Sequence, residues 1–169
     1  SIFLPKTADS GTYLIMTSVD LEQPDQVVNS RAILSVSNKY YVSQKSIYIE
    51  TWEWNASYDG TSIVKVDFAD GVITPKAAST VPGNINDNFS MSEYDGHFRV
   101  VTTDWSGEAT NGLYIFDENM QLTGKVDNLA PGEQIQSARF MGDKGYFVTY
   151  RNMDPLFCVD LSDVTNPVV

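Results

Sequence analysis

The stretch LYIFDENMQLTGKV, residues 113–126, contains two runs in which apolar and polar side chains alternate. The first run ends at Asp117, a short polar segment follows, and the second run then begins. Two alternating runs around a short polar segment predict two strands joined by a tight turn. The fold therefore depends on whether the chain contains this unit once or repeatedly.

Apolar runs that end in Asp occur four times along the chain. The four aspartates are 47, 50 and 43 residues apart, and they are Asp20, Asp67, Asp117 and Asp160. A period near 40 to 50 residues is typical of propeller blades. Because the Asp occurs once in each repeat, we expect it to accept hydrogen bonds from turn amides and to have a structural role.

Each repeat contains further short runs that complete a four-stranded unit. The predicted first strands are 32–37, 88–93 and 136–141, the second 46–54, 97–105 and 145–153, and the fourth 72–80 and 122–128. The sequence therefore predicts an all-β fold, a partial β-propeller of about three to four four-stranded antiparallel blades. We expect one domain over 1–169, with blade pieces at about 1–30, 31–80, 84–130 and 134–169.

Turn signals agree with this prediction. Asp70-Gly71 and Asp95-Gly96 each lie between two predicted strands, and Asp-Gly pairs favour hairpins because Gly accepts positive φ and the Asp side chain caps the turn. No helix longer than about two turns is expected. The segment 2–5 is predicted to be the second strand of a first, incomplete blade, so we expect a piece of a longer ring. The uncovered sheet faces at the two ends of such a piece predict self-association.

Composition narrows the classes of partner. The formal net charge is -11, from 22 acidic and 11 basic residues, which argues against binding to nucleic acid or to anionic lipid. No apolar stretch is long enough for membrane insertion. The single histidine leaves no histidine cluster for a metal, and Cys158 lies in an apolar run and is expected to be buried.

Several segments resemble a known family. LAPGE at 129–133, RFMGDKGY at 139–146 and DPLFCVDLSDVTNP at 154–167 are similar to secreted bacterial and archaeal proteins with a C-terminal β-propeller domain, distantly related to WD-repeat propellers. The resemblance covers most of the chain and is strongest from Asn88 onward. It implies a secreted protein, either extracellular or in the cell envelope. It implies no assigned activity, so no catalytic residues follow from it.

Aromatic residues suggest a ligand-binding face. Three tryptophans are predicted in loops between second and third strands, and carboxylate and amide groups lie near them in the sequence. Such groups suit a protein or carbohydrate ligand, although each Trp could instead pack between blades. The predicted ligand-binding residues are Trp52, Trp54, Trp105, Asp104, Asn86 and Asp154.

Two functions follow as hypotheses. The first is a non-catalytic binding or interaction module. The alternative is a glycan hydrolase whose site needs the missing blades, and it requires two of Glu53, Asp104 and Asp154 to lie roughly 5–10 Å apart. No cofactor or metal is predicted. The oxygen-rich segment 84–88 leaves calcium open, but it lacks the pattern of a calcium-binding loop.

Overall fold

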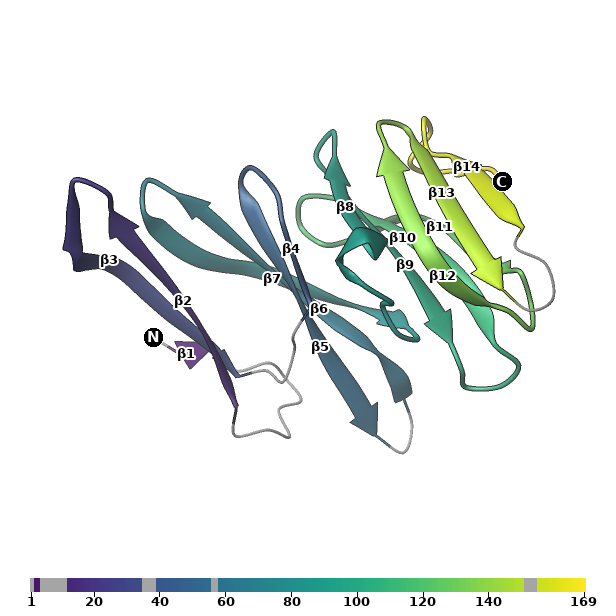
Figure 1. Cartoon of the computed structure of the whole chain (residues 1–169), viewed down its shortest axis with the longest axis horizontal. Coiled ribbons are helices and arrows are strands. Elements are labelled where there is room, and N and C mark those ends of the chain that lie inside the picture. Colours follow the sequence, from purple (N-terminus) through teal and green to yellow (C-terminus); the bar gives the residue numbers. More distant parts are fainter. Residues whose placement is uncertain (1, 4–11, 35–38, 56–57, 151–154) are drawn as a thin grey trace.

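The computed structural model describes residues 2–3, 12–34, 39–55, 58–150 and 155–169. Four separate β-sheets follow one another along the chain and stand side by side along the long axis of the molecule (Figure 1). The described part of the chain contains no α-helix, and its one helical element is the 3₁₀ turn Asn88–Ser90. The prediction of an all-β partial propeller is therefore confirmed.

The two interior sheets are complete four-stranded blades. Within each, strands that are consecutive in the sequence are also neighbours and run antiparallel, as the repeat predicted. The second sheet consists of β4 (Tyr40–Val42), β5 (Ser46–Asn55), β6 (Tyr58–Ala69) and β7 (Val72–Pro82). The third sheet consists of β8 (Met91–Tyr94), β9 (His97–Asp104), β10 (Thr110–Phe116) and β11 (Leu122–Leu129).

The two terminal sheets have three strands each. The first sheet has the order β1-β3-β2, and the fourth has the order β12-β13-β14. The first is built from β1 (Ile2–Phe3), β2 (Tyr13–Asp20) and β3 (Gln23–Leu34). The fourth is built from β12 (Gln134–Met141), β13 (Lys144–Tyr150) and β14 (Leu156–Asp160).

Two strand predictions near the N-terminus are wrong. The described part of 2–5, which was expected to precede β2 as its neighbour, instead pairs in parallel with β3, Ile2 opposite Ala32 and Phe3 opposite Ile33. The first strand of the second sheet is β4, not 32–37. The reason is the length of β3, which continues its pairing with β2 as far as Leu34, opposite Tyr13. Residues 35–37 lie outside the described residues.

The two Asp-Gly turns are confirmed. Asp70 and Gly71 have φ values of 49° and 76°, and they join β6 to β7. Asp95 and Gly96 have φ values of 46° and 75°, and they join β8 to β9. Positive φ at both central residues is the geometry whose twist matches the twist of the flanking strands.

The repeated Asp has its predicted turn role in three of four copies. The Asp117 carboxylate accepts hydrogen bonds from the backbone N–H groups of Asn119 and Gln121, at 2.9 and 2.8 Å. Asp20 and Asp160 each accept one from the residue two places on, at 2.9 Å. Asp67 differs, because its Oδ1 accepts the hydroxyl of Ser46 at 2.8 Å instead.

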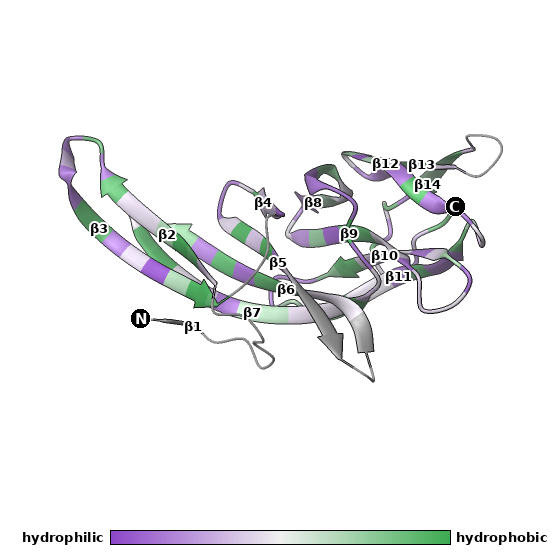
Figure 2. Cartoon of the chain, turned by 60° about the horizontal axis from the view of Figure 1, so that its bottom comes forward, coloured by the Kyte–Doolittle hydropathy of each residue, from purple (hydrophilic) through white to green (hydrophobic). Residues whose placement is uncertain are grey.

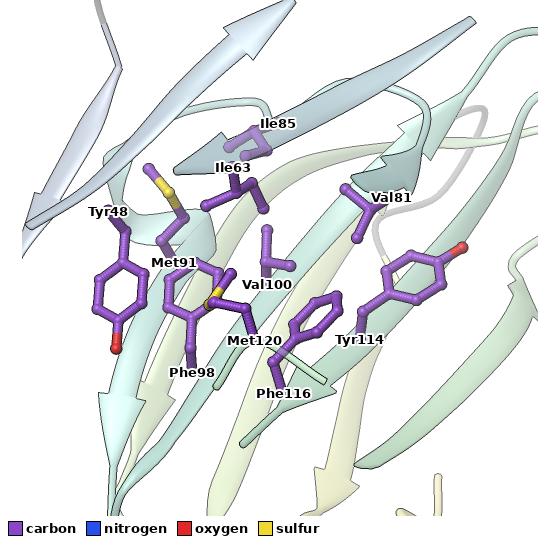
Figure 3. Packing of buried hydrophobic residues seen from close by; sticks show 10 residues of the cluster. All are labelled: Tyr48, Ile63, Val81, Ile85, Met91, Phe98, Val100, Tyr114, Phe116 and Met120. Atoms are coloured by element: carbon purple, nitrogen blue, oxygen red, sulfur yellow. The ribbon is translucent and has the colours of Figure 1, made fainter. Parts of the chain in front are cut away.

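The hydrophobic core lies between the sheets. Hydrophobic residues recur along the strands (Figure 2), and on β6 the adjacent Ile63 and Val64 enter different interfaces, because successive side chains of a strand point to opposite faces. Between the second and third sheets, Tyr48 stacks on Phe98 with ring centroids 4.0 Å apart and an interplanar angle of 12°. Residues of β5, β6 and β7 meet residues of β8, β9 and β10 there, as Figure 3 shows.

The connection from β7 to the third sheet is held tightly against β9. Asn84 and Thr103 exchange backbone hydrogen bonds of 2.8 and 3.0 Å. Gly83 has a φ of +73°, and a Cβ at this position would lie 2.4 Å from the carbonyl oxygen of Thr103. This close approach explains the glycine, since any side chain would separate the two sheets.

Cys158 is exposed, so the prediction that it is buried is wrong. It lies on β14 between Phe157 and Val159, both of which pack toward the third sheet. Strand alternation then directs Cys158 away from the core.

Candidate functional site

The predicted tryptophan loops are only partly loops. Trp52 and Trp54 lie within β5, where their backbones pair with Thr61 and Asp59 of β6, so their placement in a loop was wrong. The hairpin of β5 and β6 simply continues further than the sequence indicated, as aromatic residues in strands permit. Trp105 does lie in the connection between β9 and β10, and it is 51% exposed.

The polar residues that were predicted to bind a ligand make hydrogen bonds within the protein. The Oδ1 atom of Asp104 accepts the backbone N–H of Ser106 at 2.8 Å. The side-chain amide of Asn86 donates to the carbonyl oxygen of Gln136 at 3.2 Å, which ties the connection before the third sheet to the fourth. Asp154 and the side chains of 52–59 lie outside the described residues, so the carboxylate separation that a hydrolase requires stays a prediction.

A large cavity lies at the opposite end of the blades. It has a volume of about 890 Å³ and extends across the second and third sheets. We call it the hairpin groove, because turns β4–β5, β8–β9 and β10–β11 contribute to it. Its walls are Tyr41, Val42, Ser43, Gln44, Lys45, Ser46, Lys65, Asp67, Glu93, Tyr94, Asp95, Gly96 and Glu118.

Strand direction explains why these turns gather. In a blade whose four strands alternate in direction, the first and third turns lie at one end and the second turn lies at the other. The hairpin groove therefore lies at the end remote from the β9–β10 connection and Trp105. The molecule thus presents two separate candidate surfaces, one at each end of the blades.

A hydrogen-bond network holds the floor of the groove. Lys65 is 7% exposed, and its ammonium donates to the carbonyl oxygen of Glu118 at 2.8 Å. The same Nζ atom lies 3.8 Å from Oδ1 of Asp67, which also accepts the hydroxyl of Ser46. Lys65 therefore joins the second sheet to the turn after β10 and fixes the two walls relative to each other.

A second link holds Glu93 in the groove. The buried hydroxyl of Tyr48 donates to Oε2 of Glu93 at 2.7 Å. Burial of the Tyr48 ring, and then its hydrogen bond to Glu93, raise the pKa of this phenol far above its usual value. Tyr48 therefore stays a neutral donor, and it keeps one oxygen of Glu93 in a fixed position.

Tyr94 is supported from beneath by a buried arginine. Arg99 is 2% exposed, lies 5.1 Å from the centre of the Tyr94 ring, and donates to Ser92 Oγ and the Gly142 carbonyl at 2.8 and 2.6 Å. Its burial lowers the pKa of the guanidinium below its usual value. The arrangement holds the half-exposed Tyr94 ring at the mouth of the groove.

The groove has an excess of negative charge. Four carboxylates contribute to its walls, against two ammonium groups, and Lys65 is already engaged with the protein. The acidic residues are Asp67, Glu93, Asp95 and Glu118. An open, acidic groove with tyrosine side chains can hold polar, positively charged groups against aromatic faces.

This groove was not predicted from the sequence, although two of its signals were visible. The Asp95-Gly96 turn and the repeated Asp67 were identified, but both were assigned only structural roles. What the sequence could not show is that turns from two blades converge on one concave surface. Among the described residues, no group of three or more His, Cys, Asp or Glu side chains could hold a metal ion.

No helix among the described residues has the length and the apolar character that a membrane span requires.

Comparison with known proteins gives one family and two relatives. A family model described as "Beta propeller domain" matches residues 1–169. An uncharacterized protein of Methanocaldococcus jannaschii is 40% identical over 124 residues, which are 71% of this chain and 19% of the relative. An uncharacterized protein of Archaeoglobus fulgidus is 34% identical over 152 residues, 88% of this chain and 23% of the relative. The chain thus spans about a fifth of the length of these relatives.

Proposed function

We propose that this chain, which belongs to the β-propeller domain family, is a non-catalytic binding module. Its ligand occupies the hairpin groove. The observation that carries the proposal is the cavity of about 890 Å³ between the second and third sheets. Its size falls within the range of ligand sites, and it combines aromatic walls with a few fixed polar groups.

The ligand is a basic segment of a partner protein. The four wall carboxylates attract lysine or arginine side chains, and Tyr41 and Tyr94 line the same groove, where aromatic rings can contact cationic groups. The charge of -11 on the whole chain adds long-range attraction for such a partner and speeds encounter at low salt. A carbohydrate ligand is the competing outcome, because aromatic rings beside carboxylates also suit sugars.

Binding of a fluorescent lysine-rich peptide, followed by anisotropy, tests the proposal. We expect saturable binding that weakens as salt is added, and no binding of a glutamate-rich peptide of equal length. The double variant Asp95→Asn with Glu118→Gln should weaken binding about tenfold, as expected for the loss of two attractive charges. Both side chains are exposed, and Asn tolerates the positive φ of Asp95, so the fold should persist.

The matched control is Glu108→Gln with Asp127→Asn, which removes the same charge from exposed residues outside the groove. Equal weakening by both double variants would contradict a site in the groove, since only overall charge would matter. Salt-insensitive binding of a neutral oligosaccharide, with no peptide binding, would favour a sugar ligand. Loss of binding with Trp105→Ala alone would transfer the site to the opposite end of the blades.

We also propose an extracellular or cell-envelope location, on the basis of the family resemblance. Fractionation of the native host tests it. Recovery in the medium or envelope supports the proposal, and recovery in the cytosol contradicts it.

A further inference from the structure

A second, smaller cavity adjoins the hairpin groove. Its volume is about 380 Å³, and two residues of β4, Tyr41 and Val42, line both cavities. It forms where the 3₁₀ turn Asn88–Ser90 contacts β4 and β12, so the second, third and fourth sheets all contribute to its walls. We call it the arginine cleft, after Arg139 of β12. Four aromatic side chains line it as well, and they are Tyr40, Tyr41, Phe89 and Phe140.

The arginine cleft has the opposite charge to the hairpin groove. None of the described residues that line it is Asp or Glu, although the net charge of the chain is -11. Arg139 is exposed and forms no ion pair with a described carboxylate. Among the described residues its only hydrogen-bond acceptor is the carbonyl oxygen of Ala138, at 2.6 Å from Nη1. Since a guanidinium has five donors in a planar fork, Arg139 can still bind a carboxylate.

Aromatic stacking sets the plane of this guanidinium. The central carbon of the Arg139 guanidinium lies 3.9 Å from the centre of the Phe89 ring, which belongs to the 3₁₀ turn and is 59% exposed. A guanidinium that stacks through its face keeps the N–H groups at its edge for bidentate binding. Arg139 and Phe89 together therefore present an oriented cation beside an aromatic surface.

A buried arginine lies behind the cleft. Arg99 is 2% exposed, its guanidinium carbon lies 4.8 Å from the centre of the Phe140 ring, and its Nη2 donates to Ser92 Oγ at 2.8 Å. It forms no ion pair with a described carboxylate, and its buried Nε has no hydrogen-bond partner among the described residues. Because Ser92 accepts from Arg99, its own hydroxyl hydrogen is available to a ligand. Ser92, which lines the cleft, thus adds a donor that has a positive charge behind it.

We propose that the arginine cleft binds a small molecule with one carboxylate on a ring, a chemistry that sugar acids and aromatic acids share. Arg139 and Ser92 donate to the carboxylate, and the ring packs against the aromatic walls. A volume of about 380 Å³ lies at the low end of ligand sites, which favours a small molecule. The net charge of -11 repels polyanions, so a single carboxylate fits best. This site is additional to the peptide site proposed in the hairpin groove and does not depend on it.

NMR titration of the ¹⁵N-labelled chain tests the proposal with four probes. Glucuronate and benzoate each carry a carboxylate on a ring, acetate lacks the ring, and benzamide lacks the charge. We expect saturable shifts at the backbone amides of 88–92 and 139–140 with at least one ring acid. Acetate and benzamide should bind at least about tenfold more weakly, because each loses one of the two kinds of contact. Tighter binding of glucuronate assigns a sugar acid, and tighter binding of benzoate assigns an aromatic acid.

Variants of Arg139 locate the site. Arg139→Gln should weaken binding of the ring acid about tenfold, because it removes the charge and the fork. Arg139→Lys should have an intermediate affinity, because it keeps the charge and loses the planar fork. Lys76→Gln is the matched control, since Lys76 is exposed on β7 outside the cleft and loses the same charge. Arg139→Gln should not weaken binding of the lysine-rich peptide, so the two proposals can fail separately.

Four results would overturn the proposal. They are no saturable binding of either ring acid, binding of acetate or benzamide as tight as that of the ring acids, equal weakening by Arg139→Gln and Lys76→Gln, and shifts confined to the hairpin groove. Saturable binding of a glutamate-rich peptide with no binding of the ring acids would also overturn it, because the cleft would then select acidic peptides.

Discussion

The interior and terminal sheets are built from similar strands and differ in what covers them. On β9 in the third sheet, the adjacent residues Val100 and Val101 are 0% and 1% exposed, because one faces the second sheet and the other the fourth. On β2 in the first sheet, exposed residues alternate with partly buried ones. Burial in this molecule is therefore set by the position of a strand in the array as well as by its own sequence.

This difference has a consequence for the energetics. An apolar side chain in an interior sheet contributes its transfer free energy and its packing, whereas a similar side chain on an open face remains largely in water. The interior interfaces should therefore dominate the free energy of unfolding.

The largest effect should come from truncation of an interior aromatic residue. Phe98 is 1% exposed and stacks on Tyr48, so Phe98→Ala should lower the free energy of unfolding by about 3–5 kcal/mol. Tyr13→Ala on the open face should change it by less than about 0.5 kcal/mol. Urea denaturation followed by circular dichroism measures both.

Phe98→Leu serves as a milder variant if Phe98→Ala does not fold. It retains an apolar side chain and should still destabilise more than Tyr13→Ala. Similar losses at Phe98 and Tyr13 would mean that the first sheet is covered in solution, and the distinction between interior and terminal sheets would then fail for the isolated chain.

A smaller effect is expected at the repeated Asp. Asp117→Ala leaves two turn amides without their acceptor and should lower the free energy of unfolding by about 1 kcal/mol. Asp20→Ala in the terminal sheet removes one such bond and should have a smaller effect. Asp95→Asn is the control for a turn position where the side chain has no repeat role, because Asn tolerates the positive φ of Asp95. Equal, negligible changes at Asp117 and Asp95 would show that the repeated Asp does not stabilise the turns.

Much of this architecture could be predicted from the sequence. The Asp period and the Asp-Gly pairs are local signals, and each depends on a few neighbouring residues with defined turn geometry. The alternating runs gave β9, β12 and β13 nearly in their observed positions. These features follow from the chain itself, without knowledge of which sheets become neighbours.

The features that were missed depend on distant parts of the chain. The length of β3 is set by its pairing with β2, so a boundary at 32–37 could not be located from local pattern. Trp52 and Trp54 are in a strand because β6 extends to pair with them. The hairpin groove requires turns from two blades, and the exposure of Cys158 requires knowing that its face of the fourth sheet is open.

The smallest expected effects are two pH dependences of opposite sign, one in an interior sheet and one in a terminal sheet. Glu50 on β5 is 5% exposed, and burial raises the pKa of its carboxyl, although Lys39 at 3.5 Å opposes the shift. Asp160 at the end of β14 accepts a hydrogen bond from Lys144 at 2.8 Å and another from Ser162, and these lower the pKa of its carboxyl.

The signs follow from proton linkage. The pKa of the Glu50 carboxyl is raised in the folded state. Its contribution to stability is therefore fully present below pH 4.5, the pKa in the unfolded state, and is lost as the pH rises through the pKa of the folded state. The pKa of the Asp160 carboxyl is lowered in the folded state, so its contribution to stability is present above pH 3.8, the unfolded pKa, and is lost as the pH falls.

Urea denaturation across the acid to neutral range should therefore show that Glu50→Gln gains stability relative to the parent as pH rises. Asp160→Asn should lose stability relative to the parent at neutral pH and approach it in acid, with added salt reducing the difference because the pair is exposed. A Glu50→Gln profile parallel to the parent would mean that water reaches this carboxyl, and the interface between the second and third sheets would then be less closely packed than the interior comparison requires.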